Sequence, residues 1–176
     1  MNSRARVGGS SGGASGRLAA WSRGCLTMQG YGALDDRARR RLWLGLRFAP
    51  ALCLAGIVLG MALASPPLLF AMVALAGLGG FVTPKHPFDY LYDLAVRPLL
   101  GGDRVPPSPP PRRFACQLAT PWIAAVGVAL LAHASTPAWI LAVPLLAVAA
   151  MVTTTNWCLP SFIYSLVHRR TGQAPA

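Results

Sequence analysis

The sequence predicts an all-α membrane protein, a four-helix bundle of two transmembrane hairpins with an interfacial amphipathic helix in the loop between them. Apolar residues make up 54% of the 176 residues, more than is usual in a soluble domain. Two blocks, 48–82 and 114–152, contain no Asp, Glu, Lys or Arg. Each block is long enough to cross a bilayer twice, because one helical span needs roughly 20 residues.

The first hairpin is predicted over 37–82, with spans at about 44–64 and 67–82 separated by a turn at Ser65 and Pro66. A helix of about 20 residues rises about 30 Å, which matches the hydrocarbon core. Gly56 and Gly60 have GxxxG spacing, which places two small residues on one helix face. We expect the second span to pack closely against them.

The second hairpin and its tail are predicted over 114–170, with spans at about 114–133 and 137–158. Residues 1–36 read as a disordered basic arm, rich in Gly, Ser and Arg, and residues 171–176 as a disordered end. Such segments contain too little apolar surface to offset the entropy of ordering them.

The polar segment 83–113 lies between the hairpins and contains a predicted helix at 87–97. Pro87 suits a first helical turn and Pro98 is expected to stop the helix. Apolar residues from Phe88 to Ala95 form one stripe, whereas Asp89, Asp93 and Arg97 form another at a spacing of four. This pattern predicts a helix lying at the membrane interface.

The basic residues all lie on one predicted side of the membrane. None occurs in the short connections 65–67 and 133–137. By the positive-inside rule, both termini and the central loop are cytoplasmic. The preference for Arg over Lys, with abundant Ala, Gly and Pro, indicates a bacterial source, and we expect the cytoplasmic membrane. The twelve flanking residues are Arg37, Arg39, Arg40, Arg41, Arg47, Lys85, Arg97, Arg104, Arg112, Arg113, Arg169 and Arg170.

The two hairpins resemble each other in sequence. Arg47-Phe48-Ala49 opens the first, and Arg113-Phe114-Ala115 opens the second. Tyr92 and Tyr164 follow the two return spans at similar distances from the turn prolines. If the hairpins are repeats, the segment from Cys158 is the counterpart of the helix from Pro87, and both lie on the cytoplasmic side.

Three motifs resemble an uncharacterised family of bacterial four-span membrane proteins, known only as a domain of unknown function. They are HPFDYLYDLAVRPLLG (86–101), PPSPPPRRFA (106–115) and WCLPS (157–161). The resemblance implies the four-span fold and no particular activity. The chain departs from the family pattern at His86, where relatives have Asn, and at Ser161, where they have a second Cys.

Two sets of side chains suggest chemistry. His86, Asp89 and Asp93 offer an imidazole and two carboxylates at helical spacing, as a Zn or Mn site would. The alternative is that Asp93 pairs with Arg97, Asp89 caps the helix or faces water, and His86 is a surface residue. We favour this alternative and expect no metal, because no fourth ligand is evident.

Cys116 and Cys158 are candidate thiols for a redox role, and Cys53 also falls in the cytoplasmic half of its span. The chain has no CxxC motif, and buried cysteines usually pack as small apolar residues. Packing is therefore the competing interpretation.

Residues and motifs that the sequence lacks argue against several classes of function. Ion-coupled carriers use charged residues inside the membrane, and the chain has no nucleotide-binding loop, no GxSxG, no HExxH and no Glu. We expect a non-enzymatic accessory or docking protein without a cofactor. The alternatives are a thiol protein using Cys116 and Cys158, and a small-solute channel or transporter.

The expected partners are the lipid bilayer and a cytoplasmic or membrane protein, with a second copy of the chain as another candidate. Nucleic acid is not expected, because basic and aromatic residues are not interleaved on a soluble surface. The candidate interaction loop comprises His86, Pro87, Phe88, Asp89, Tyr92, Asp93, Arg97, Arg112 and Arg113.

Overall fold

The computed structural model describes residue 21 and residues 24–170, with side chains to residue 167. This part of the chain is helical and contains no strand. The disorder predicted for 1–20 and 171–176 lies outside the described residues. The elements are α2 (Asp36–Ala62), α3 (Pro66–Gly77), the π-helix η1 (Leu78–Val82), α4 (Pro87–Leu91), the π-helix η2 (Tyr92–Val96), α5 (Arg97–Leu100), α6 (Pro110–Leu131), α7 (Ser135–Thr155) and α8 (Leu159–Arg170).

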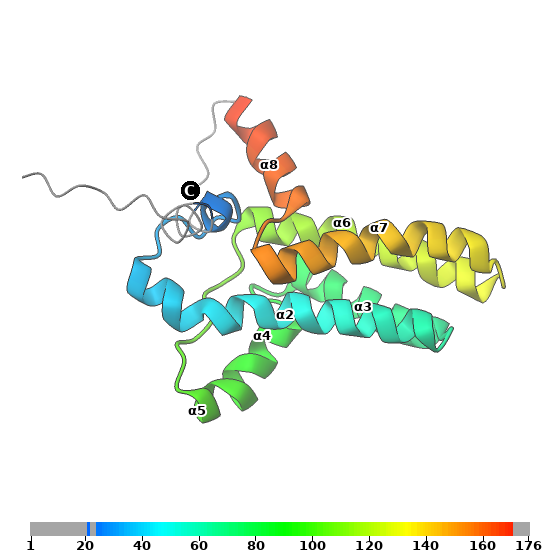
Figure 1. Cartoon of the computed structure of the whole chain (residues 1–176), viewed down its shortest axis with the longest axis horizontal. Coiled ribbons are helices and arrows are strands. Elements are labelled where there is room, and N and C mark those ends of the chain that lie inside the picture. Colours follow the sequence, from blue (N-terminus) through cyan, green and yellow to red (C-terminus); the bar gives the residue numbers. More distant parts are fainter. Residues whose placement is uncertain (1–20, 22–23, 171–176) are drawn as a thin grey trace, which may run out of the picture.

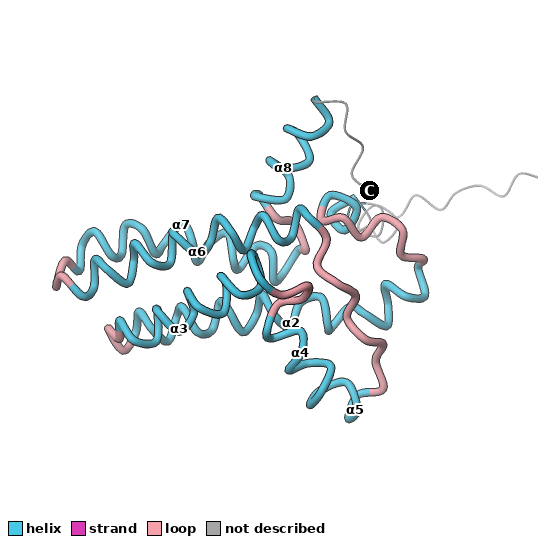
Figure 2. The backbone as a smooth tube through the Cα atoms, turned by 180° about the vertical axis from the view of Figure 1, so that it is seen from behind, coloured by secondary structure: helices cyan, strands magenta, loops and turns pink. Residues whose placement is uncertain are grey.

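Four helices form the body of the molecule (Figure 1). α2 packs against α3 and α7, and α6 packs against the same two helices. The α2–α3 and α6–α7 turns lie at one end of this body, and the segment from Thr83 to Pro109 runs across the other end (Figure 2). Each helix therefore has two neighbours around a shared interior.

Three helices, α2, α6 and α7, are long and apolar enough to cross a membrane. Pro66–Val82 and Pro87–Leu100 pass the same test together, as a pair bent by 92°. Counting that pair as one span gives up to four. The prediction of several apolar spanning helices in an all-α chain is thus confirmed.

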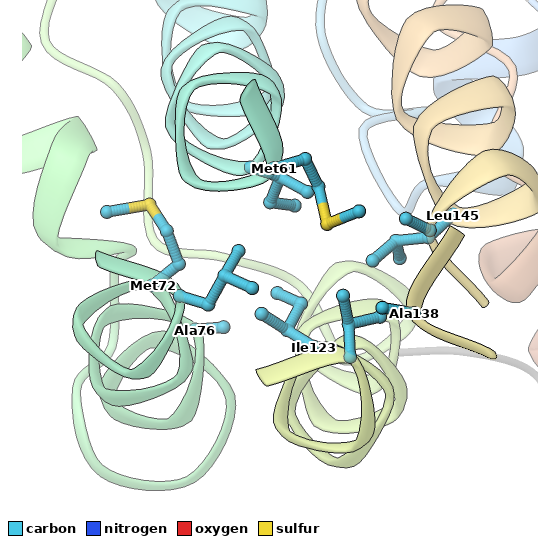
Figure 3. Close-up of a cluster of buried hydrophobic side chains, with 10 residues drawn as sticks. Met61, Met72, Ala76, Ile123, Ala138 and Leu145 are labelled. Atoms are coloured by element: carbon cyan, nitrogen blue, oxygen red, sulfur yellow. The ribbon is translucent and has the colours of Figure 1, made fainter. Parts of the chain in front are cut away.

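The interior near the two turns is filled by apolar side chains from all four helices. Leu69, Val126, Ala138 and Ala142 have no exposed surface. Met61, Ala76, Ile123 and Leu145 belong to the same cluster, and Met72 lies between α3 and α2 at its side (Figure 3). This tightly packed cluster closes the interior at the turn end.

Gly56 and Gly60 face α3, as the sequence predicts. A Cβ atom on Gly60 would lie 2.6 Å from Cδ2 of Leu69, and one on Gly56 would collide with Sδ of Met72. A larger residue at either point would force Leu69 or Met72 to shift, so the glycines favour the close approach of α2 and α3.

The N-terminal segment, residues 24–34, differs from the predicted disordered arm. Residues 24–28 are helical, and Leu26 and Tyr31 are buried with Leu42, Tyr92 and Val105 in a second apolar cluster. The disorder prediction is therefore wrong for this segment. The burial of Leu26 and Tyr31 depends on contacts with residues distant in sequence, which local composition does not reveal.

Pro98 does not stop the helix that begins at Pro87. Helical structure continues through α4, η2 and α5 to Leu100; we call this continuous segment the loop helix. In η2 the Arg97 amide donates to the Tyr92 carbonyl, one residue further back than in an α-helix. Nε of Arg97 also donates to the Asp93 carbonyl at 3.3 Å. The wider turn thus accommodates a residue without an N–H group.

The paired features of the two hairpins recur in the structure. The Phe48 and Tyr92 rings lie 5.5 Å apart at 53°, and the Phe114 and Tyr164 rings lie 5.6 Å apart at 47°. In both cases a Phe on the outgoing helix contacts a Tyr on the helix that follows the return. The loop helix and α8 therefore occupy equivalent places, and both project from the body (Figure 1).

We predict that Gly60→Ala lowers the stability of the purified protein in detergent, because Leu69 is fully buried and must shift. Overpacking of this kind costs about 1–3 kcal/mol. Gly77→Ala is the matched control, since its nearest neighbour would be 3.7 Å away. Thermal unfolding followed by size-exclusion chromatography measures both. Equal midpoints for the two variants would contradict the close packing.

Candidate functional site

An ion pair between Asp89 and Arg112 lies in the interior at the loop end. Nη2 of Arg112 donates to Oδ1 of Asp89 at 3.0 Å, and Nη1 donates to the Tyr31 hydroxyl at 2.8 Å. The Asp89 side chain has no exposed surface. Burial raises the pKa of Tyr31, which keeps its hydroxyl protonated. The network joins the N-terminal segment, the loop helix and α6 at one point.

His86 begins the loop helix and is buried beside this pair. Its Nδ1 accepts from the Phe88 amide at 3.3 Å, and the His86 amide donates to Oδ2 of Asp89 at 3.3 Å. The two side chains cap the first turn reciprocally. The Asp89 carboxylate therefore has two polar partners, the Arg112 guanidinium and the His86 amide, and no exposed surface.

The neutral His86 ring directs a proton toward a thiol. Burial, with the positive charge of Arg112 nearby, lowers the pKa of His86 to about 4. Because Nδ1 accepts a hydrogen bond, the single ring proton resides on Nε2. Nε2 of His86 then donates to Sγ of Cys53, 3.7 Å away. The surface position expected for His86 is wrong.

Asp93 pairs with Lys85 at 2.8 Å and not with Arg97. Its other oxygen accepts from the Val105 amide at 2.9 Å. The π-turn accounts for the difference, since it places Arg97 over the Asp93 carbonyl instead of the carboxylate. Both carboxylates expected to face a partner are thus used inside the protein.

The remaining loop residues do not converge on one surface. Tyr92 is buried, whereas Pro87, Phe88 and Arg97 are partly exposed. Arg113 reaches the Phe81 carbonyl at 3.4 Å. His86, Asp89 and Asp93 do not assemble a metal site, and no cluster of three or more His, Cys, Asp or Glu with such geometry occurs among the described residues.

A cavity of about 290 Å³ lies in the body at the loop end. Its floor includes Ile57, Ile123 and Leu145, which belong to the packed cluster near the turns. The surrounding walls are mostly small or apolar: Ala49, Ala76, Ala115, Ala119 and Ala149 leave space that larger side chains would fill. The cavity therefore exists because the helices have short side chains at this level.

Three thiols from separate parts of the chain line this cavity: Cys53 of α2, Cys116 of α6 and Cys158 between α7 and α8. All are free cysteines, and each is partly exposed. His86 and Arg112 line the same cavity. The predicted pair of Cys116 and Cys158 thus shares one space.

The sequence gives little indication that Cys53 and His86 belong with this pair. They are separated by 33 positions and meet only because α3 returns beside α2. Asn156 is a further buried polar residue at this end of the body. With its amide oxygen facing α2, it accepts from Nε and Nη2 of Arg47 at 3.3 and 3.1 Å.

Comparison with known proteins places the chain in a family. A family model described as Domain of unknown function (DUF4395) matches residues 44–169. The chain belongs to this family. No curated protein matches the chain. No solved structure matches it either.

The DUF4395 region includes Asp89, Arg112 and the three cysteines of the cavity. It confirms the resemblance to an uncharacterised family that the sequence motifs suggest. Tyr31 lies before the matched region, so the third member of the buried network comes from outside it.

We predict that Asp89→Ala destabilises the folded protein by about 3–5 kcal/mol, because it leaves the buried Arg112 charge without its partner. The control is Asp103→Ala, which removes a pair to Arg41 with half-exposed side chains and should cost at most about 1 kcal/mol. Thermal melts in detergent provide the comparison. A double change of Asp89→Leu with Arg112→Leu should recover much of the loss.

If the Asp89→Ala and Asp103→Ala variants unfold at the same temperature, the buried pair does not organise the loop end of the protein.

Proposed function

We propose that this protein is a four-span membrane thiol protein in which Cys116 and Cys158 cycle between dithiol and disulfide. The observation that carries the proposal is the shared cavity, where three thiols from distant parts of the chain meet beside His86 and Arg112. Thiol chemistry needs two sulfurs with access to one another and to a reactant, and a common cavity supplies both.

Polar groups lie beside the thiols. Arg112 places a positive charge on the cavity wall. His86 adds an N–H donor to Cys53. A nearby cation and hydrogen-bond donors are the features that activate cysteines in redox proteins.

The non-enzymatic docking role has less support. It relies on Asp89 and Asp93 as partner contacts, yet these side chains are 0% and 15% exposed and form internal ion pairs. The channel alternative also has less support, since the packed cluster fills the interior at the turn end. We therefore propose the thiol role in their place.

We further propose two transmembrane hairpins with interfacial helices at the loop end. Leu94 and Leu99 on the loop helix are 80% and 85% exposed. On α8, Leu159, Phe162, Ile163, Leu166 and Val167 recur at helical spacing and are all exposed. Such apolar stripes on projecting helices suit burial at the boundary between headgroups and hydrocarbon. A second copy of the chain remains an alternative partner for these faces.

For the orientation, we propose a bacterial cytoplasmic membrane with both termini and the loop helix in the cytoplasm. The positive-inside rule supports it, as all twelve flanking basic residues lie at one end. The cavity thiols then lie near the reducing cytoplasmic side, where a disulfide must be formed by a dedicated oxidant.

We predict that reporter fusions after Gly101 and after Gly172 both report a cytoplasmic location. Cysteine substitutions at Ser65 or Ser135, made in a chain without its own cysteines, should react with a membrane-impermeant maleimide added outside intact cells. The reverse orientation would place many Lys and Arg outside, against the positive-inside rule. An external Gly101 fusion would contradict the topology.

We predict a reversible disulfide when only Cys116 and Cys158 remain, with Cys25→Ser and Cys53→Ser. After diamide treatment of membranes, both thiols should resist a mass-tagged maleimide, and dithiothreitol should restore both. A chain retaining only Cys25 and Cys158 is the control, because Cys25 does not line the cavity. It should stay fully labelled.

Full labelling of Cys116 and Cys158 after diamide treatment would contradict the proposal and indicate that the two cysteines only pack in the interior. If a disulfide forms only in a chain that retains Cys53 and Cys116 and lacks Cys158, the reactive pair is Cys53 and Cys116.

A further inference from the structure

The cavity is open on the side of the body. Three of its lining residues, Leu118, Leu159 and Ile163, are also exposed at 40%, 37% and 42%. They come from α6 and from the start of α8, which pack together. The opening therefore has an apolar rim. In the membrane orientation proposed above, this rim faces lipid and not water.

The lining of the cavity is mostly apolar, with Trp122 and several aliphatic side chains. Its polar lining residues include His86, Arg112 and Gln29, beside the thiols of Cys53 and Cys116. His86 contacts Cys53, and His86 and Arg112 both bind Asp89, so these polar groups lie together. An apolar pocket with a few polar groups at one end typically orients a ligand that has a polar head and an apolar body. A ligand reaching this site from lipid must itself dissolve in the bilayer.

The thiols restrict the class of ligand further. Converting two thiols into a disulfide releases two electrons and two protons, which an acceptor must take up. A quinone dissolves in the bilayer, has a flat head with two carbonyl oxygens, and accepts two electrons and two protons. No metal is needed for this exchange. These properties fit the apolar opening, the group of polar lining residues and the dithiol together.

We propose that this cavity binds a lipid-soluble quinone, which oxidises the Cys116 and Cys158 pair. The two S–H bonds break and one S–S bond forms, while the quinone carbonyl oxygens gain the two protons and the ring gains the two electrons, giving the quinol. This inference rests on the proposed thiol function and adds its oxidant.

The test uses the full chain in lipid nanodiscs, reduced and then freed of reductant without oxygen. The probe is decylubiquinone, whose ring is fully substituted, so that thiols cannot add at a free ring carbon. We expect one quinol formed for every two thiols lost, and no quinol with Cys116→Ser or Cys158→Ser. The same samples treated with diamide show whether the disulfide can form at all.

Two matched variants locate the reaction. Leu118→Trp fills the opening and should abolish quinone-driven oxidation while leaving the smaller, water-soluble diamide effective. Leu131→Trp changes an equally apolar, 61% exposed residue at the opposite end of α6 and should react as wild type. Because Leu118→Trp can disturb folding, a photoreactive azidoquinone on the wild-type protein gives a second measurement. Its label should fall on peptides containing Leu118 or Ile163.

The outcomes separate the two proposals. A disulfide formed with diamide but never with the quinone overturns the quinone inference and leaves the thiol function standing. No disulfide with either reagent overturns both. If the quinone oxidises Leu118→Trp as fast as wild type, the quinone does not use this cavity and the inference is overturned. Azidoquinone label spread over the lipid-facing helices has the same meaning.

Discussion

The ion pair between Asp89 and Arg112 is the interaction on which the loop end depends. Two charges this well buried are stable only when each has its partner and further hydrogen bonds, and Tyr31 and the His86 amide supply those. The pair fixes the loop helix against α6. It thereby places His86 beside Cys53 and Arg112 beside Cys116, so the chemistry of the cavity follows from the position of one carboxylate.

The rest of the body is divided between a packed end and an open end. Near the turns, Met61, Met72 and Leu69 fill the interior, and Gly60 allows the helices to approach. Near the loop, alanines line the walls and leave the cavity. The two hairpins contribute equivalent Phe and Tyr contacts to this end, and the loop helix and α8 project from opposite sides of it (Figure 1).

Much of the fold was predictable from hydropathy, because long apolar blocks without charges form few structures other than membrane-spanning helices. The Gly56 and Gly60 face and the Phe–Tyr correspondence were also visible as local spacing. The site was harder to predict. Arg112 looked like one more basic residue of a cytoplasmic loop, but α6 begins at Pro110 and carries it inward. The continuation through Pro98 depends on a π-turn that has no sequence signature here. The meeting of Cys53, His86 and Cys116 arises from packing between distant segments, which periodicity does not reveal.

The central claim is that thiols from separate parts of the chain line one cavity. Native mass spectrometry of the reduced protein with phenylarsine oxide tests it directly, because the trivalent arsenic binds stably only where two thiols meet. The account predicts one arsenic per chain, retained in Cys25→Ser and lost in Cys116→Ser. A protein that binds no arsenic, or that binds it equally well without Cys116, would contradict the account.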